Sequence, residues 1–420
     1  MRYNQEIGGN NFLSNSVLDE VNNIDRFVAN NNKAKNNQNT IQADYTQDLK
    51  KNQKFDIGVK AILRTASSEF KSLIKFNEAD KYEFNPSNSD YFKFYQTVYS
   101  MYGTYSFKVK SISIRSGYRI EHTATNGNFA ASMMKVERSY VNLLPNVQIS
   151  FKVLPAVTLL LNYNKRIQRP FIWNLNPFVN NNDTFNISSG NPTLNPQAIH
   201  NFSAQTKIFK GQSFAALALM ISYSNNLIIQ YSVFEPAIGR INTIPDNIGK
   251  EFQMSLNGTL STKINQDWNV FFNGNIRYNR IRNKFFPEQV NHGIGGNGTM
   301  NSTYSIFKNF QLSSYAGFWK SPVTIQNQQN ISYWYGIGIG YKMLGEKLSV
   351  SIDVANFLKQ KVSNYSITED PSFNMKTINI TPFRSIGLSI SWNFGKLSGN
   401  TSKKRGVNND DIIANQQPNN

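Results

Sequence analysis

The sequence predicts an all-β chain that forms a transmembrane antiparallel up-and-down β-barrel. Three observations predict this fold. Apolar and polar residues alternate with a period of two in many windows, the windows are long, and the joins between them are alternately short and long. Together these observations indicate strands with one apolar and one polar face that are long enough to cross a membrane.

The composition indicates a folded chain with a basic charge. The 420 residues are 40% hydrophobic and 13% aromatic, which is too rich for a disordered polymer. The net charge of +18 would ordinarily indicate nucleic acid or an anionic membrane as a partner. The lysines, however, are spread along the whole chain, for example Lys50, Lys51, Lys108, Lys110, Lys152, Lys210, Lys263, Lys308 and Lys347. A nucleic-acid-binding surface concentrates such residues, so we expect no nucleic-acid partner.

Several other classes are excluded by what the sequence lacks. It contains no cysteine, so disulfides, thiolate metal sites and cysteine nucleophiles are excluded. The longest apolar block, 214–221, is about half of a helical membrane span, which excludes a helical membrane protein. The residues after Met1 lack the apolar core and cleavage site of a secretory signal. We expect that the true start lies upstream, or that the chain is a fragment or a processed product.

The period of two is clearest between Phe252 and Ile264. There, apolar or small residues such as Met254, Leu256 and Leu260 alternate with polar ones. The same pattern recurs in windows 99–109, 112–120, 147–153, 157–167, 268–278, 333–341, 348–358 and 386–394. No amphipathic helix of comparable clarity is present. These windows are therefore predicted to be half-buried strands.

The length and aromatic content of the windows distinguish a membrane barrel from a soluble sandwich. The windows run for about 10 to 16 residues, whereas globular strands usually have about 5 to 6. Aromatic residues lie near their ends: Trp268, Tyr278, Tyr333, Tyr341, Trp392 and Phe394. Such residues form the two aromatic girdles of a membrane barrel. The alternative, aromatic residues that fill a sandwich core, is less favoured.

The joins between the windows give an independent argument. Short joins are expected at 49–54, 107–110, 152–155, 209–213, 263–267, 307–309 and 343–347. Long joins rich in Asn and Pro are expected at 71–91, 125–137, 169–197, 234–250, 283–290, 320–330 and 359–382. Outer-membrane barrels alternate short periplasmic turns with long extracellular loops in this way. Counting between the joins gives about fifteen strands and a remnant at 2–7, so about sixteen.

The chain is predicted to divide into two parts. Residues 1–396 form the barrel, which lacks some amino-terminal strands. Residues 397–420 are polar and rich in Asn and Gln, and they are expected to form a disordered tail on the periplasmic side.

One long motif is specific enough to indicate a family. It consists of Arg166, Arg169, Pro170, Leu175, Asn176, Pro177, Phe178, Gly190, Asn191, Pro192, Leu194 and Pro196. Further matches lie at 44–49, 58–60, 116–121 and 392–396. With these residues the chain resembles the outer-membrane β-barrel family of TonB-dependent receptors, of the kind common in Bacteroidetes.

The resemblance implies part of a plugged barrel of about 22 strands. A plug domain, an energy-coupling segment and about six strands of that barrel have no counterpart in this sequence. The implied function is a receptor or transporter in the Gram-negative outer membrane that binds and imports an unknown ligand when complete. The implied partners are outer-membrane lipid and lipopolysaccharide, the barrel assembly machinery, and TonB if a plug lies upstream. No cofactor is implied.

The motif also has a physical interpretation. Its four prolines cannot donate ladder hydrogen bonds, so the segment should leave the sheet and form a stiff extracellular loop. Gly190 and Asn191 suit turn conformations. Arg166 and Arg169 end the preceding strand, where they could anchor the loop or bind an anion such as a lipopolysaccharide phosphate. Anchoring is favoured, which makes the motif structural.

We find no signature of catalysis or metal binding in the sequence. His122, His200 and His292 lack metal-site spacing. The glycines at 293–298 match a dinucleotide fingerprint by letters, but a strand follows them where the fingerprint requires a helix. The pairs Glu369–Asp370 and Asp410–Asp411 are interpreted as solvated residues without ordered partners. No enzyme is expected.

Two alternatives from other classes stay open. One is a passive pore, or a structural or adhesive outer-membrane barrel without active transport. The other is a soluble all-β binding protein. Under the favoured hypothesis, loops 71–91, 169–197 and 234–250 are the candidates for ligand contact, because loops at a barrel mouth carry recognition.

Overall fold

The computed structural model describes residues 2–8, 11–19, 25–50, 52–77, 79–130, 132–179, 185–345 and 347–394, with side chains from Phe27 onward except that of Lys50. The predicted tail at 397–420 lies outside these residues. Within them, no helix is long and apolar enough to span a membrane.

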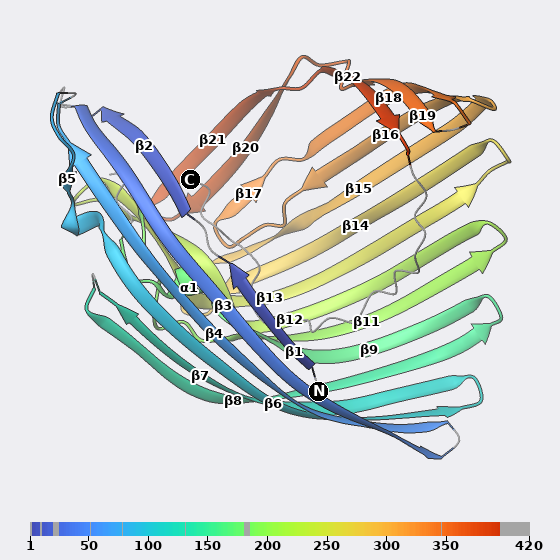
Figure 1. Ribbon diagram of the computed structural model, residues 1–420, viewed down its shortest axis with the longest axis horizontal. Helices are drawn as coiled ribbons and strands as arrows, with labels where there is room; N and C mark the ends of the chain where they lie inside the picture. The colour runs from blue at the N-terminus through green and yellow to red at the C-terminus, as the bar shows by residue number, and fades with distance from the viewer. Residues whose placement is uncertain are drawn as a thin grey trace.

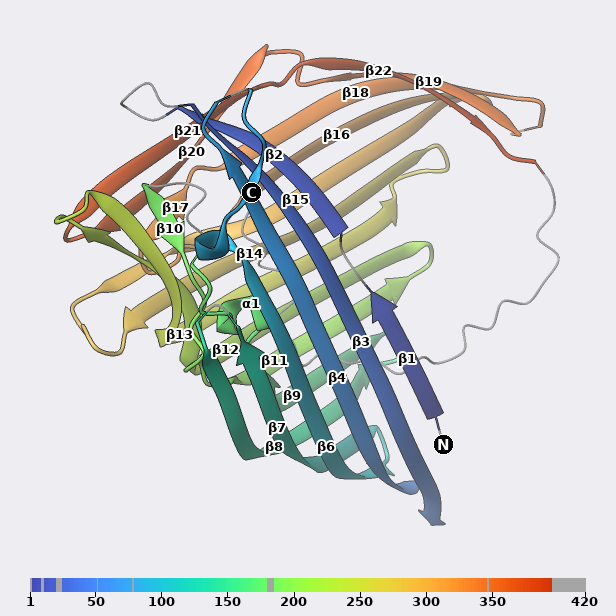
Figure 2. The same ribbon diagram turned by 60° about the vertical axis from the view of Figure 1, so that its left-hand side comes forward.

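Fifteen long strands form the main sheet. They are β3 (Asp25–Lys50), β4 (Gln53–Lys75), β6 (Asp90–Val109), β7 (Ile112–Phe129), β8 (Met134–Leu154), β9 (Val157–Gln168), β11 (Gln197–Lys210), β12 (Ser213–Glu235), β13 (Arg240–Lys263), β14 (Trp268–Asn283), β15 (Val290–Phe307), β16 (Phe310–Lys320), β18 (Ser332–Met343), β19 (Leu348–Ala355) and β22 (Ser385–Trp392). Each pairs antiparallel with the next. Figures 1 and 2 show them side by side in one curved sheet around a hollow.

Two short strands complete the count of about sixteen. β1 (Arg2–Gly8) pairs with residues 36–42 of β3, and β2 (Asn11–Asp19) pairs with residues 25–33 of the same strand. Since both run antiparallel to β3 along the same edge, they act as one interrupted strand. The predicted antiparallel up-and-down topology is confirmed.

The remaining elements all lie in the long joins. β17 (Asn327–Gln329), β20 (Lys361–Asp370) and β21 (Phe373–Pro382) form a separate three-stranded sheet. β5 (Glu83–Phe84) pairs with β4, and β10 (Asn186–Ser188) pairs in parallel with β13. A helical turn, α1 (Ile172–Leu175), and a 3₁₀ turn, η1 (Pro86–Asn88), occupy two of the joins.

The expected order of short and long joins is present, with two differences. The short joins lie together at one end of the sheet, at the right of Figure 1. At the other end, the predicted long joins 125–137 and 234–250 are mostly strand, because β7 and β8 pair as far as Phe129 and Met134, and β12 and β13 as far as Glu235 and Arg240. The Asn and Pro content of these segments therefore led to an overestimate of loop length. Pro245, for example, lies within β13 opposite Gln230 of β12.

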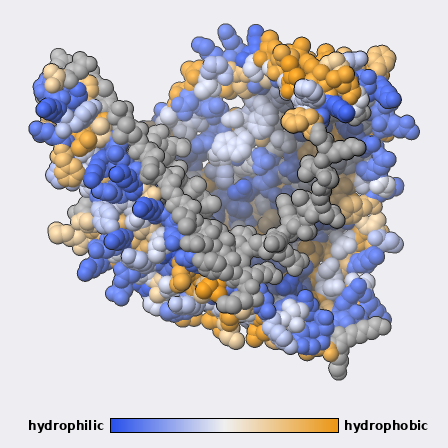
Figure 3. Space-filling model, viewed as in Figure 1, coloured by the Kyte–Doolittle hydropathy of each residue, from blue (hydrophilic) through white to orange (hydrophobic). Residues whose placement is uncertain are grey.

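The two faces of the sheet differ in polarity, as the period of two predicts. In β13, Met254 and Leu256 are 43% and 46% exposed, whereas Ser255 between them is 4% exposed. Trp268, Tyr278, Tyr341 and Trp392 lie exposed as expected for girdles. Tyr333 differs, since it packs edge-on against Phe383. In Figure 3 the hollow is mainly blue, and a large orange patch lies at the top of the view.

The described sheet has two free edges. β22 pairs with β19, and no described strand pairs with its other edge. At the opposite end of the sheet, β1 and β2 pair with β3 and with no further described strand. The described strands therefore form a curved wall that does not close on itself.

One glycine of the 293–298 run is required by the backbone. The run lies inside β15, as the sequence predicted, and Gly296 has a φ of +148°. A Cβ atom there would lie 2.2 Å from the carbonyl oxygen of Asn275 on β14. The glycine therefore permits the close approach of these two strands.

Replacing Gly296 with alanine is expected to lower the free energy of unfolding by about 1–3 kcal/mol, because of both backbone strain and the clash. Urea unfolding in detergent micelles measures it. The control is Gly258→Ala, where the new Cβ would meet its nearest neighbour at an ordinary 3.8 Å. Equal shifts for both variants would contradict this interpretation of Gly296.

Candidate functional site

The loop between β9 and β11 enters the mouth of the wall at its long-loop end. β9 pairs with β8 only up to Asn164 opposite Asn146, but with β11 up to Gln168 opposite Gln197. The last residues of β9 thus leave β8 while they stay paired with β11. This divergence lets the chain continue from Arg169 into the hollow.

Arg169 anchors the start of this loop. Its side chain is fully buried, and its Nη2 donates to Glu121 Oε2 and to Thr123 Oγ1, both at 2.7 Å. Glu121, on β7, is buried too. It forms a second ion pair with Arg119, whose Nε lies 2.5 Å from Glu121 Oε1. A buried carboxylate between two guanidinium groups is well compensated, so the cluster holds the loop base against the wall.

The middle of the loop depends on a close backbone contact at Gly190. The Gly190 N–H donates to the Asn176 carbonyl at 2.7 Å, and the next N–H, of Asn191, donates to the Asn174 carbonyl at 2.6 Å. A Cβ on Gly190 would lie 2.4 Å from the Asn176 oxygen. Asn176 also donates from Nδ2 to Asp90 Oδ2 at 3.1 Å, which ties this turn to β6. Only glycine fits where the two halves of the loop meet.

The end of the loop is clamped by Asn247 of β13. The Asn195 N–H donates to Asn247 Oδ1 at 2.6 Å, and Asn247 Nδ2 donates back to the Asn195 carbonyl at 3.0 Å. The side-chain amide of Asn247 therefore bonds to both backbone groups of Asn195, as a neighbouring strand would. Gln197 adds a further contact, because its Oε1 accepts the N–H of Ile228 on β12 at 3.2 Å.

An apolar cluster fills the space under the loop. Its buried members are Phe92, Phe94, Phe129, Val136, Leu175 and Leu194, and Trp173 and Ile172 pack against them. Phe92 meets Trp173 edge-on with ring centroids 5.5 Å apart. The loop is thus held by side-chain burial as well as by hydrogen bonds, which makes it a packed part of the mouth.

A second set of contacts joins the β12–β13 hairpin to the β20–β21 hairpin. Asp370 Oδ2 accepts hydrogen bonds from Tyr231 at 3.0 Å and from Gln326 at 2.8 Å. Gln326 also bridges to the backbone of Ser232 through its Oε1 and Nε2. The expectation that Asp370 is a solvated residue without ordered partners is wrong, because the β20–β21 hairpin returns to the mouth and brings Asp370 to Tyr231.

The pKa of the Asp370 carboxyl reflects these contacts. Burial alone would raise its pKa, but hydrogen bonds from Ser372, Gln326 and Tyr231 outweigh burial and hold the pKa below its usual range. Because the folded pKa lies below the unfolded one, the carboxylate stabilises the contact at pH values above the unfolded pKa. This stabilisation is lost as the pH falls through the folded pKa.

The predicted motif residues differ in burial and fall into three groups. Leu175, Asn176 and Leu194 are buried with Arg169 in the mouth, whereas Arg166 is exposed and does not share the Glu121 contact. The others are partly buried: Pro170, Pro177, Phe178, Gly190, Asn191, Pro192 and Pro196. The ring centroids of Phe178 and Phe70 lie 5.7 Å apart.

Several contact residues were not identified from the sequence. Thr123, Asp90, Asn247 and Gln326 all hold the mouth together, and no local motif marks them. Glu121 gave one usable signal, since it is an acidic residue at an inward position of a strand. His122, His200 and His292 lie on different strands, and the described residues contain no group of three metal-ligating side chains.

Removing the charge of Glu121 tests the anchor. The Glu121→Gln variant removes the Glu121 carboxylate charge beside the buried Arg169 guanidinium, and we expect the free energy of unfolding to fall by about 3 kcal/mol. The Arg169→Met variant should lose less free energy of unfolding, because Glu121 keeps its ion pair with Arg119. Urea unfolding measures both variants, and proteolysis within 169–197 should accelerate in parallel.

The matched control is Glu235→Gln. Glu235 pairs with Arg240 at 2.9 Å, but both side chains are about a third exposed. Solvent screens such pairs, so no measurable change is expected. If the Glu121 and Glu235 variants lower the free energy of unfolding by the same amount, the buried cluster does not anchor the loop.

The Asp370→Asn variant tests the contact between hairpins. At pH 7 we expect amide hydrogen exchange in 361–382 to become about threefold to tenfold faster, because two charge-assisted hydrogen bonds weaken. In the unmodified protein, exchange corrected for its intrinsic pH dependence should stay constant down to about pH 4 and rise only below it. Glu369→Gln is the control, and an equal effect there would contradict the assignment.

Comparisons with known proteins agree with this architecture. The structure is similar to the unliganded ferric citrate transporter FecA (TM-score 0.62, 13% identity, covering 93% of this chain and 59% of FecA) and to the copper transporter OprC (0.63, 12%, 93% and 65%). It is also similar to the ferric yersiniabactin uptake receptor FyuA from Yersinia pestis (0.59, 11%, 94% and 58%). The chain therefore spans about three fifths of the length of these three proteins.

The family assignment rests on the sequence. No curated protein sequence matches the chain. The model of the outer membrane protein beta-barrel family matches residues 1–392, nearly the whole chain. The expected resemblance and the expected location in the outer membrane are confirmed, and the protein belongs to the outer membrane protein β-barrel family.

Proposed function

We propose that this chain forms the barrel wall and ligand-receiving mouth of a TonB-dependent receptor that imports a ligand across the outer membrane. The observation that carries the proposal is the packed mouth. The 169–197 loop and the two hairpins are joined by buried or partly buried contacts at Glu121, Asn247 and Asp370. A simple diffusion channel needs an open path and gains nothing from such an assembly, whereas a receptor needs loops in fixed positions to recognise its ligand.

The proposed role of the family motif is structural. Arg169, Asn176, Gly190 and Leu194 hold the loop within the mouth, so that the neighbouring exposed residues are presented to the ligand. Loop 71–91 and the end of the β12–β13 hairpin at 234–250 border the same space and are proposed to share in ligand contact. The ferric complexes and copper named for the similar structures indicate a metal-containing ligand as the first class to examine.

The complete receptor requires contacts beyond the described wall. In lipid, unpaired backbone groups are costly, so β22 and the β1–β2 edge must both be paired in the working barrel. We propose that the long loops face outward and the short turns face the periplasm. TonB is the proposed energy-coupling partner where a plug accompanies this barrel, the barrel assembly machinery inserts it, and lipopolysaccharide surrounds its outer half.

The alternative is a passive pore or a structural barrel. It is favoured by the hollow with a polar lining, which a channel shares with a plugged receptor. The two functions differ in whether the mouth is closed at rest and whether transport needs energy.

Planar-bilayer recordings of the protein purified from outer membranes test the proposal. We expect no steady large conductance at rest, because a plug domain would occupy the lumen of the complete receptor. In cells, uptake of radiolabelled ferric citrate or Cu²⁺, used as probes, should stop when an uncoupler removes the proton gradient. A steady conductance together with uptake that ignores the uncoupler would establish the pore instead.

A further inference from the structure

One row of side chains crosses six neighbouring strands on the outward face. The ladder registers place its members directly opposite one another from β9 to β15: Lys165, His200, Tyr223, Phe252, Arg280 and His292. We call this set the basic row. It contains two basic pairs, Lys165 with His200 and Arg280 with His292, separated by two aromatic residues. Adjacent strands lie about 4.8 Å apart, so each pair brings two nitrogen-bearing groups to one place.

The next outward row toward the short turns is entirely apolar or aromatic. Its members are also cross-strand partners: Tyr163, Phe202, Ile221, Met254, Tyr278 and Ile294. The basic row therefore lies at the boundary where the lipid-facing surface meets the polar headgroups at the long-loop end.

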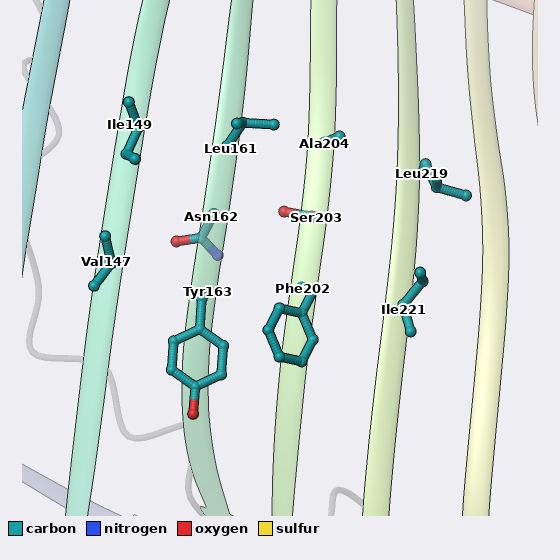
Figure 4. A pocket seen from close by; sticks show the side chains of 10 residues that line it. All are labelled: Val147, Ile149, Leu161, Asn162, Tyr163, Phe202, Ser203, Ala204, Leu219 and Ile221. Carbon is teal, nitrogen blue, oxygen red and sulfur yellow. The ribbon is translucent and has the colours of Figure 1, made fainter.

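An apolar groove runs directly below the Lys165–His200 pair. Figure 4 shows its lining side chains on four neighbouring strands. They are Val147, Ile149, Leu161, Asn162, Tyr163, Phe202, Ser203, Ala204, Leu219 and Ile221. The small side chain of Ala204 leaves a depression beside the Phe202 and Tyr163 rings. Its apolar lining suits a hydrocarbon chain.

Tyr163 fixes the orientation of the His200 ring. His200 Nδ1 shares a hydrogen bond with the Tyr163 hydroxyl at 3.1 Å, and the two rings are stacked with centroids 6.3 Å apart. On β14 and β15, the ring centroids of Tyr278 and His292 lie 6.4 Å apart, so the histidine of each basic pair lies beside a tyrosine ring.

The charge of the basic row is not compensated by acidic residues. None of the twelve residues in the two rows is Asp or Glu. In the outward row above, Lys250 lies opposite Arg282, which adds further positive charge next to Arg280. A surface with cations and imidazoles above, and an apolar groove below, is complementary to an acylated lipid that carries phosphate groups.

We propose that the basic row and the groove beneath it form a binding site for the phosphorylated lipid A moiety of lipopolysaccharide. The Lys165–His200 and Arg280–His292 pairs each receive a phosphate, and an acyl chain lies in the groove beside Ala204. The proposal rests on the outer-membrane location and on the proposed outward orientation of the long loops, and it is independent of any transport activity.

The test is native mass spectrometry of the 420-residue chain titrated in detergent with lipid A. The Lys165→Gln/Arg280→Gln double variant should bind phosphorylated lipid A about 25-fold more weakly, from about fivefold for each cation near a lipid headgroup. Its binding of phosphatase-treated lipid A should be unchanged. Ala204→Phe fills the groove and should weaken binding of both lipids. Heat-modifiable gel mobility verifies that each variant is folded.

The control removes the same charge at the other end of the barrel. Lys210→Gln/Lys263→Gln changes two exposed lysines near the short turns and should bind lipid A within about twofold of the unmodified protein. Equal weakening by both double variants would overturn the site, because charge alone would then explain binding. Unchanged binding by Lys165→Gln/Arg280→Gln would also overturn it. Neither result would bear on uptake or conductance, so the proposed function is tested separately.

Discussion

The architecture depends on the antiparallel backbone ladder. In the hydrocarbon core of a membrane there is no water to satisfy backbone N–H and C=O groups, so each strand must be paired on both sides. Among the described residues, the strands of the wall from β3 to β19 are paired on both sides, and β22 is paired on one. Once the ladder is set, the pleat sends alternate side chains to lipid and to the hollow, and both the apolar belt and the polar lining follow from it.

The polar side of the wall creates the conditions for the packed mouth. An ion pair such as Arg169–Glu121 is favourable only where its charges are enclosed and its remaining hydrogen-bonding groups are satisfied. The inward positions of β7 supply Glu121 and Thr123 on one line, two residues apart, and the loop supplies the guanidinium. The long β12–β13 hairpin then brings Asn247 to the end of the same loop, and Tyr231 to Asp370. The loop and hairpins at the mouth therefore form one connected unit.

Sequence reasoning predicted features with a local cause and missed those set by long-range contacts. The alternation from Phe252 to Ile264 reports a pleat, so the strands, their number and their order of turns were predictable. Asn and Pro content marked 234–250 as a loop, but tertiary pairing with β12 made most of it strand. The separation of Arg166 from Arg169 depends on where β9 leaves β8, and Asp370 meets Tyr231 across 139 residues. No spacing rule encodes either event.

The most direct measurement is single-cysteine labelling along β13 in intact outer membranes, which the absence of native cysteine makes clean. Cysteines at 253–260 would be tested with a water-soluble maleimide and with a lipid-soluble quencher acting on an attached fluorophore. The account predicts opposite, alternating responses: even positions, including Met254 and Leu256, respond to the lipid probe, and odd positions, including Ser255 and Asn257, do not. Responses that do not alternate would contradict a two-faced wall in the membrane.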